Sequence, residues 1–187
     1  MKTIAQLLSK EDVLLDLEVP DKQSMFEALG RHFEQYHDIA ASDVVDGLNT
    51  REKLGSTGVG QGVAIPHARV EGLCSAAAAF VRLKWPFDFE ACDSGPVNYC
   101  FALLVPTQSA EQDLKILENV AVMFAREQFR HQLAAAITAD DVHQLFDEWR
   151  ERKSVRPRPI GSSSWLTRAV DTIFMTRTFD ATESNVR

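Results

Sequence analysis

The stretch between Arg51 and Arg69 contains the residue types that phosphoryl chemistry requires. Four glycines fall within eight residues, a short β-type run follows them, and a proline separates that run from His67. Glycine lets backbone N–H groups converge with no Cβ in the way, and concave clusters of N–H groups bind anions. A neutral imidazole is a competent nucleophile, and a guanidinium matches phosphate oxygens in a planar fork. Together these residues indicate a phosphoryl-transfer site centred on His67.

Two better-known phosphate motifs are excluded by individual residues. A P-loop requires a lysine after the last glycine of its loop, and here Gln61 follows Gly60. A dinucleotide-binding loop would require a glycine where Val63 stands, and a strand ahead of the loop. The simplest alternative is that the glycines only shape a turn and that His67 is an ordinary loop histidine.

The elements around this stretch must present His67 to a partner. Pro66 cannot donate to a sheet ladder, so it ends a strand or lies on an edge, and it favours an extended backbone at Ile65. We therefore expect His67 to be an exposed loop histidine at the mouth of a strand. The segment before the glycines is typical of a helix, with Ser42 as its cap and Arg51 near its C-terminal end.

The motif Arg-Glu-x-Leu-Gly-Ser-Thr-Gly-x-Gly-x-Gly-x-Ala-Ile-Pro-His, which runs from Arg51 to His67, is long and specific. It resembles the phosphorylation-site signature of the fructose/mannitol-type enzyme IIA domains of the bacterial phosphotransferase system, and in particular their nitrogen-regulatory, PtsN-type branch. The resemblance continues in Pro86–Phe89 and from Pro96 to Pro106, and it covers residues 1–150. It implies an α/β fold with a mixed β-sheet flanked by helices on both faces.

The resemblance also implies the role of each residue in the motif. His67 would be the nucleophile that accepts the phosphoryl group, and Arg51 would neutralise the phosphoryl oxygens. It implies neither a cofactor nor a metal. The expected phosphate-binding loop comprises Ser56, Thr57, Gly58, Gly60 and Gly62.

One position departs from the family pattern. The family commonly has a second histidine near the start of the helix that follows the Val-Pro strand end, and here that position is Asp113. A carboxylate could orient His67 and raise its basicity. It would also repel a phosphoryl group, which carries about −1.5 to −2 charges. Both effects of Asp113 remain open at this point.

The resemblance further implies a set of partners and three related functions. A phosphocarrier of the HPr type would supply the phosphoryl group, which derives ultimately from phosphoenolpyruvate. The protein would then be a phosphohistidine relay with a regulatory role, signalling to a transporter or a sensor kinase. The alternatives are a sugar-transport component that passes the group to an enzyme IIB, and a phosphorylation-switched binding module without onward transfer.

Length and composition agree with one globular domain plus an extension. The chain has 187 residues, 45% of them hydrophobic, and no apolar run reaches the length of a membrane span. Because the sequence contains no signal peptide, we expect a cytoplasmic protein. The three cysteines are odd in number and form no C-x-x-C pair, which indicates reduced thiols. The net charge is −7. An acidic chain argues against nucleic acid as a partner; it favours docking of a basic protein or serves solubility alone.

The composition changes after the predicted domain, residues 1–150. Residues 151–187 begin with a basic, proline-containing stretch that is typical of a linker. Apolar residues from Trp165 to Phe174 then recur with a helical period. This segment is either an amphipathic helix for a partner or a membrane surface, or a largely disordered tail.

Hydrophobic periodicity predicts the remaining elements. The run Ala76–Leu83 is ambiguous, because alanines favour a helix while its length permits a buried strand; the resemblance decides for a strand. His32, His37 and His131 are expected at the surface, and no metal-ligand spacing is present. The predicted strands are 13–17, 63–65, 76–83 and 97–105. Predicted helices are 3–8 and 109–124, each with a capping box at its start, 42–51, and part of 127–137. Two further helices are expected, one that begins at Asp21 and ends near His32 or His37, and one that is capped at Thr138 and includes Trp149.

Overall fold

A computed structural model describes residues 4–107 and 110–152, with side chains described for all of these except 110–114 and 150–152. Its sheet has the strand order β1-β5-β6-β3-β2, and β4 also pairs with β6. β5 and β6 run antiparallel, whereas β1 is parallel to β5 and both β3 and β4 are parallel to β6. The strands are β1 (Val13–Leu17), β2 (Gly58–Gly60), β3 (Val63–Ala64), β4 (His67–Val70), β5 (Ala77–Phe87) and β6 (Val97–Pro106).

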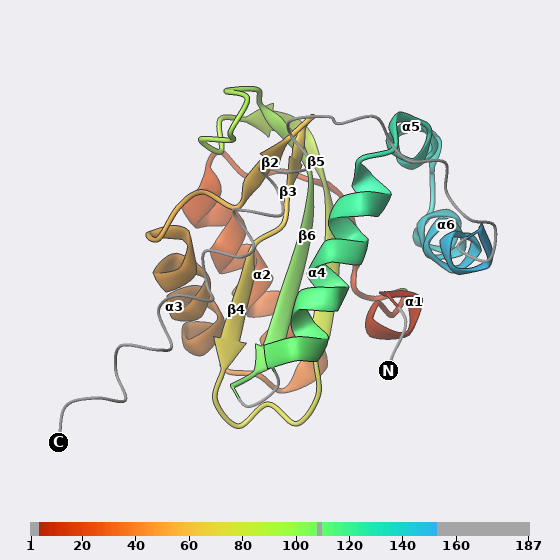
Figure 1. Ribbon diagram of the computed structural model, residues 1–187. Coiled ribbons are helices and arrows are strands. Elements are labelled where there is room, and N and C mark those ends of the chain that lie inside the picture. Colours follow the sequence, from red (N-terminus) through yellow and green to blue (C-terminus); the bar gives the residue numbers. More distant parts are fainter. Residues whose placement is uncertain (1–3, 108–109, 153–187) are drawn as a thin grey trace, which may run out of the picture.

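Helices cover both faces of this mixed sheet (Figure 1). Two separate apolar cores, one on each face, follow from the alternation of side chains along the strands. On one face α2 and α3 pack on the sheet, and on the other face α1, α4, α5 and α6 do so. The helices are α1 (Ile4–Leu7), α2 (Lys22–His37), α3 (Ala41–Glu52), α4 (Ala110–Phe124), α5 (Glu127–Ala135) and α6 (Ala139–Arg152).

The sheet and its two helical layers confirm the predicted fold class. The ambiguous alanine run is a strand, β5, and it pairs with both β1 and β6 at the centre of the sheet. Strands buried on both faces are apolar throughout, which is why this run lacks the alternation that marks a half-exposed strand. The capping box at Thr138 is also present, because Thr138 and Asp141 each accept a hydrogen bond from the backbone N–H of the other.

The strand that leads to His67 is broken in the middle. β3 and β4 pair with β6 at the same register, with Ala64 opposite Cys100 and His67 opposite Leu103. Ile65 and Pro66 lie between them outside the regular ladder, although the Pro66 carbonyl still accepts a hydrogen bond from the Leu103 N–H (3.0 Å). Pro66 therefore interrupts one strand without shifting its register.

Two local predictions are wrong. The N-cap of α3 is Ala40, not Ser42, and the Glu34 side chain accepts the N–H of Ala41 instead (3.2 Å). His32 does not lie at the surface but is buried, whereas His37 is partly exposed; both imidazoles contact Asp12. His131 is exposed as predicted. The predicted cap at Ser109 and the tail from 153 to 187 lie outside the described residues.

Among the described residues, no helix has both the length and the apolar character that crossing a membrane would need.

Candidate functional site

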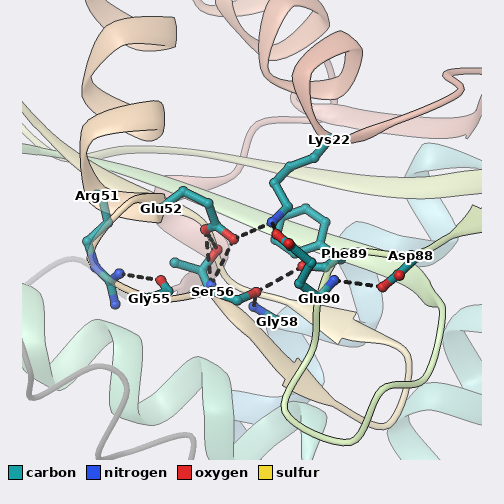
Figure 2. Close-up of polar contacts among 10 residues, drawn as sticks. Lys22, Arg51, Glu52, Gly55, Ser56, Gly58, Asp88, Phe89 and Glu90 are labelled. Carbon is teal, nitrogen blue, oxygen red and sulfur yellow. Dashed lines mark hydrogen bonds and ion pairs between the residues drawn. The ribbon is translucent and has the colours of Figure 1, made fainter.

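α3 carries Arg51 to the edge of the sheet. The helix packs against β4, where Gly47 lies so close to Ala68 that a Cβ at position 47 would come within 3.0 Å of the Ala68 Cβ. Arg51 lies in the last turn of this helix and is 7% exposed. Its Nη1 donates to the Gly55 carbonyl (2.9 Å), which ties the guanidinium to the loop that follows the helix (Figure 2). The position of Arg51 in the last turn of α3 and the packing of α3 against β4 therefore place its side chain next to β4.

The glycine-rich segment folds into a tight hairpin, not an open loop. β2 and β3 pair antiparallel, and the turn between them requires positive φ at Gly60 (+90°), Gln61 (+57°) and Gly62 (+75°). Gly58 has a different reason to be glycine, because a Cβ there would lie 2.8 Å from the Ala91 Cα. The glycines thus fit a turn and a close backbone approach, as their conformational freedom permits.

His67 is the first residue of β4 and is 8% exposed, which corrects the expectation of an exposed loop histidine. Its Nδ1 lies 2.9 Å from the Ile65 carbonyl oxygen, and Arg51 Nε donates to its Nε2 at 3.0 Å. A carbonyl can only accept, so the proton of the neutral ring is on Nδ1. Nε2 therefore carries the lone pair and faces Arg51.

The surroundings keep this imidazole neutral. Burial disfavours the charged ring, and the positive charge of Arg51 does so as well, whereas the hydrogen bond to Ile65 acts in the opposite direction. The result is a pKa of His67 lowered to about 4. Burial also lowers the pKa of Arg51. At neutral pH the pair consists of a neutral imidazole and a guanidinium that donates a hydrogen bond to its Nε2.

Glu52, the residue after Arg51, organises the start of the hairpin. Its Oε2 accepts hydrogen bonds from the hydroxyl and the N–H of Thr57 (2.6 and 3.0 Å). Its Oε1 forms an ion pair with Lys22 at 2.9 Å, and Lys22 also contacts Glu90 at 2.8 Å (Figure 2). The Glu52 side chain is only 10% exposed. This carboxylate therefore joins α3, the N-terminal turn of α2 and the hairpin.

Ser56 and Phe89 make a second connection across the hairpin. The Ser56 hydroxyl donates to the Phe89 carbonyl (2.9 Å) and accepts from the Gly58 N–H (3.1 Å). The Lys22 ammonium lies 4.5 Å from the centre of the Phe89 ring, within the range of a cation–π contact. Lys22 was not among the residues expected at the site. Glu52 and Phe89 did have a signal in the sequence, because Glu52 belongs to the motif and Phe89 ends the segment Pro86–Phe89 in which the resemblance continues.

Several hydrogen-bond donors of the predicted phosphate-binding loop already have acceptors within the protein. The hydroxyls of Ser56 and Thr57 donate to Phe89 and Glu52. The N–H groups of Thr57, Gly58 and Gln61 also have acceptors, namely Glu52, Ser56 and Asp93. Direct phosphate contacts from Ser56, Thr57, Gly58, Gly60 and Gly62 remain predictions, and the described contacts give Ser56 and Thr57 a role in shaping the hairpin.

Asp113 lies in the first turn of α4, and its side chain is outside the described ones. α4 begins four residues after β6 ends, at the end of the sheet where β4 also ends. His67 shares a sheet face with Val63 and Ile65, because the register is the same on both sides of Pro66, and that face is the one α4 covers. The backbone therefore places Asp113 on the His67 side of the sheet.

The site thus consists of a buried histidine at a strand break, in contact with an arginine, in a mixed sheet between two layers of helices. Residues 6–149 match the family described as "Phosphoenolpyruvate-dependent sugar phosphotransferase system, EIIA 2", and the chain belongs to this family. Proteins of this family are phosphoryl carriers that act with phosphocarriers and IIB partners.

Individual relatives agree with this assignment. The chain is 35% identical to a nitrogen regulatory protein from Pseudomonas aeruginosa over 146 residues, which are 78% of this chain and 95% of that protein. The crystal structure of the nitrogen regulatory protein IIA-Ntr from Neisseria meningitidis superposes with a TM-score of 0.74 at 38% identity, covering 76% of this chain and 98% of the other. These matches confirm the resemblance to the nitrogen-regulatory branch.

A third match supports the fold alone. The Escherichia coli mannitol enzyme IIA, whose structure was determined in complex with phosphorylated enzyme IIB, superposes with a TM-score of 0.63 at 16% identity. The match covers 76% of this chain and 99% of that one.

Proposed function

We propose that this protein is a phosphohistidine relay with a regulatory role, in which His67 accepts a phosphoryl group from an HPr-type phosphocarrier. The observation that carries the proposal is the orientation of the imidazole. Nδ1 donates its proton to the Ile65 carbonyl oxygen, 2.9 Å away, so that Nε2 would be the nucleophilic atom, and Arg51 Nε lies 3.0 Å from Nε2. Membership in a family of phosphoryl carriers supports it.

The transfer step follows from this geometry. The lone pair of Nε2 attacks the phosphorus, the bond between phosphorus and the carrier's histidine nitrogen breaks, and the electron pair of that bond returns to the carrier. Positive charge then develops on the His67 ring, and the Ile65 carbonyl stabilises it through the Nδ1 proton. Such transfers need positioning and charge stabilisation more than covalent assistance from the protein.

Arg51 changes partner during this step. In the structure its Nε–H occupies the lone pair of Nε2, so the guanidinium must turn from the nitrogen to the phosphoryl oxygens as the carrier docks. Its planar fork suits two of those oxygens. The bond from Nη1 to Gly55 limits how far the guanidinium moves. The same arginine would thus protect the free site and stabilise the occupied one.

The regulatory half of the proposal draws on the relatives named nitrogen regulatory protein. Phosphorylation of His67 would add about −1.5 to −2 charges. A change of that size at a site flanked by Arg51 alters which partners dock, for instance a transporter or a sensor kinase. The alternatives are onward transfer to an enzyme IIB, the partner with which the mannitol enzyme IIA was determined, and a binding module without onward transfer.

Reconstitution tests the proposal directly. The purified protein is incubated with phosphoenolpyruvate, enzyme I and an HPr-type carrier, and its intact mass is followed over time. We expect one acid-labile phosphoryl group on the wild type and none on His67→Gln, whereas His131→Gln, which changes an exposed histidine, should behave as the wild type. Phosphorylation of the His67→Gln variant would refute the assignment. Adding an enzyme IIB then distinguishes onward transfer from a terminal regulatory mark.

A further inference from the structure

A buried cluster of one carboxylate and two imidazoles lies at the other end of α2 from Lys22. Asp12, just before β1, has an exposure of 0%. The Nε2 atoms of His32 and His37, both on α2, lie 2.8 and 2.6 Å from its Oδ1. One ligand atom from each of the three residues falls within 4.8 Å of the others. None of these residues takes part in the site around His67.

The carboxylate of Asp12 is held in place from the other side. Its Oδ2 accepts the Ser9 N–H at 2.9 Å, and its backbone carbonyl accepts the Phe80 N–H of β5 at 2.8 Å. The two oxygens of this carboxylate thus have separate partners, Ser9 at Oδ2 and the two imidazoles at Oδ1. The cluster therefore contains a fixed carboxylate oxygen that faces two imidazole nitrogens.

We propose that Asp12, His32 and His37 bind a divalent first-row transition metal ion, with Zn²⁺ as the best match. Two imidazole nitrogens and one carboxylate oxygen are a ligand set that Zn²⁺ takes in proteins, with water as the fourth ligand. The carboxylate offsets one of the two charges of the ion. The His37 side chain is 24% exposed, so solvent reaches the cluster at this residue.

The ligand atoms must shift to admit the ion. With bonds of about 2.0–2.1 Å, the ligands of a tetrahedral Zn²⁺ lie roughly 3.3 Å apart. The imidazoles must therefore withdraw from Oδ1, which they contact at 2.8 and 2.6 Å, and their two nitrogens, which lie within 4.8 Å of each other, must reach the same spacing. His37 is the last residue of α2, and the chain reverses at Asp38 with φ of 56°. This position is less constrained than a helix interior. His37 is therefore the ligand that adjusts.

Metal binding requires a change in the proton positions of both rings. In the absence of metal, each imidazole donates its Nε2 proton to Asp12, because a carboxylate can only accept. When metal binds, each ring adopts the tautomer with its proton on Nδ1, and both Nε2 lone pairs coordinate the ion.

The alternative function of the cluster is a purely structural one, in which the two hydrogen bonds attach the end of α2 to the start of β1.

Titration of the full-length protein with ZnCl₂ separates these two functions. The protein is first treated with a chelator and dialysed, and binding is followed by calorimetry in the wild type, in His37→Gln and in His131→Gln. Loss of a direct ligand should weaken Zn²⁺ binding by at least ~10²-fold, the upper end of what loss of an outer-shell partner causes. The control His131→Gln changes an exposed histidine outside the cluster and should bind as the wild type does.

Substitution with CoCl₂ checks the ligand type. A site of two nitrogens and one oxygen gives the visible bands of four- or five-coordinate Co²⁺ without thiolate charge-transfer bands, which would appear if Cys74 or Cys92 were the ligands. Equal Zn²⁺ affinity in the wild type and in His37→Gln, or no micromolar binding to the wild type, would overturn the proposal. The metal proposal is independent of phosphoryl transfer, because the cluster takes no part in the site around His67. His37→Gln should therefore still be phosphorylated on His67 at the wild-type rate.

Discussion

The buried, neutral state of His67 predicts that this protein loses stability in mildly acidic solution. The pKa of His67 is lowered from 6.5 to about 4 in the folded protein, through burial and the nearby charge of Arg51. Between these two values the unfolded chain binds a proton at this residue and the folded protein does not. The free energy of unfolding must therefore fall as the pH drops from 6.5 to 4, and this contribution is constant above and below that window.

The size of the effect follows from the same two values. Each pH unit within the window corresponds to about 1.4 kcal/mol, so the full difference is roughly 3 kcal/mol, and about 2 kcal/mol of it is lost between pH 7.5 and pH 5. A domain with a typical stability of about 5–15 kcal/mol would lose a measurable part of it. Asp12 contributes little in this range, because the pKa of its carboxyl is lowered from 3.8 and its loss occurs at more acidic pH.

Urea denaturation at pH 7.5 and pH 5 measures this loss, with His67→Gln as the matched variant. Glutamine retains an acceptor for Arg51 but does not titrate, so its stability should fall by about 2 kcal/mol less than that of the wild type over the same interval. Other groups that titrate are common to both proteins and cancel in the difference. If the wild type and His67→Gln lose the same stability, the imidazole is not held neutral, and the reasoning about its surroundings fails.

Three further predictions concern the residues around His67. Arg51→Ala should slow phosphorylation by about 10²- to 10³-fold, the usual cost of removing a charge-stabilising donor. Arg51→Lys should recover only part of the wild-type rate in the same mass assay, because lysine lacks the planar fork. Unchanged rates in both variants would exclude Arg51 from the reaction. Glu52→Gln should destabilise the protein by about 1–3 kcal/mol in urea, because the amide replaces one of the two acceptor oxygens by an NH2 donor and so leaves either Lys22 or Thr57 without its buried acceptor. Glu90→Gln, which changes a side chain that is 79% exposed, should cost under ~1 kcal/mol. Equal losses in the two variants would contradict a structural role of the buried Glu52 carboxylate. Asp113→His should speed phosphorylation, and Asp113→Asn should speed it less, because both variants remove a negative charge from the approach of the phosphoryl group. Both effects should be larger at low salt. Slower transfer in both variants would mean instead that Asp113 orients the imidazole.

The fold was predictable because its signals are local or carried by a long motif. Helical periodicity in α2, α4 and α6 and the apolar run of β6 appear directly in the sequence. For β5 the alanines pointed to a helix, and only the resemblance favoured the strand. Its pairing with β6, the next strand in the chain, and with β1, which lies far earlier in the sequence, determines its conformation. Tertiary pairing outweighs intrinsic propensity here, as it commonly does for a central strand.

The environment of His67 was less predictable. The sequence placed the histidine next to Pro66 and the glycines, but its burial depends on α3 and on the face that α4 covers. His32 and His37 illustrate the same limit. Their spacing of five on a helix favours no common site, and their meeting point is Asp12, about 20 residues earlier in the chain. Contacts of this kind require the arrangement of elements in space.

Pro66 connects the local chemistry of the motif with the fold. In a regular strand the N–H and C=O of one residue point to the same neighbour, and successive residues alternate. The Pro66 carbonyl bonds to β6, so Ile65 faces the opposite side, where its N–H bonds to Thr57. β2 begins only at Gly58, opposite Ala64, and beyond it the Ile65 carbonyl has no regular ladder partner. The Nδ1 of His67 bonds to this carbonyl at 2.9 Å, which sets the tautomer and leaves the lone pair on Nε2. The strand break at Ile65 and Pro66 thus supplies the carbonyl that orients the imidazole of His67, the proposed phosphoryl acceptor.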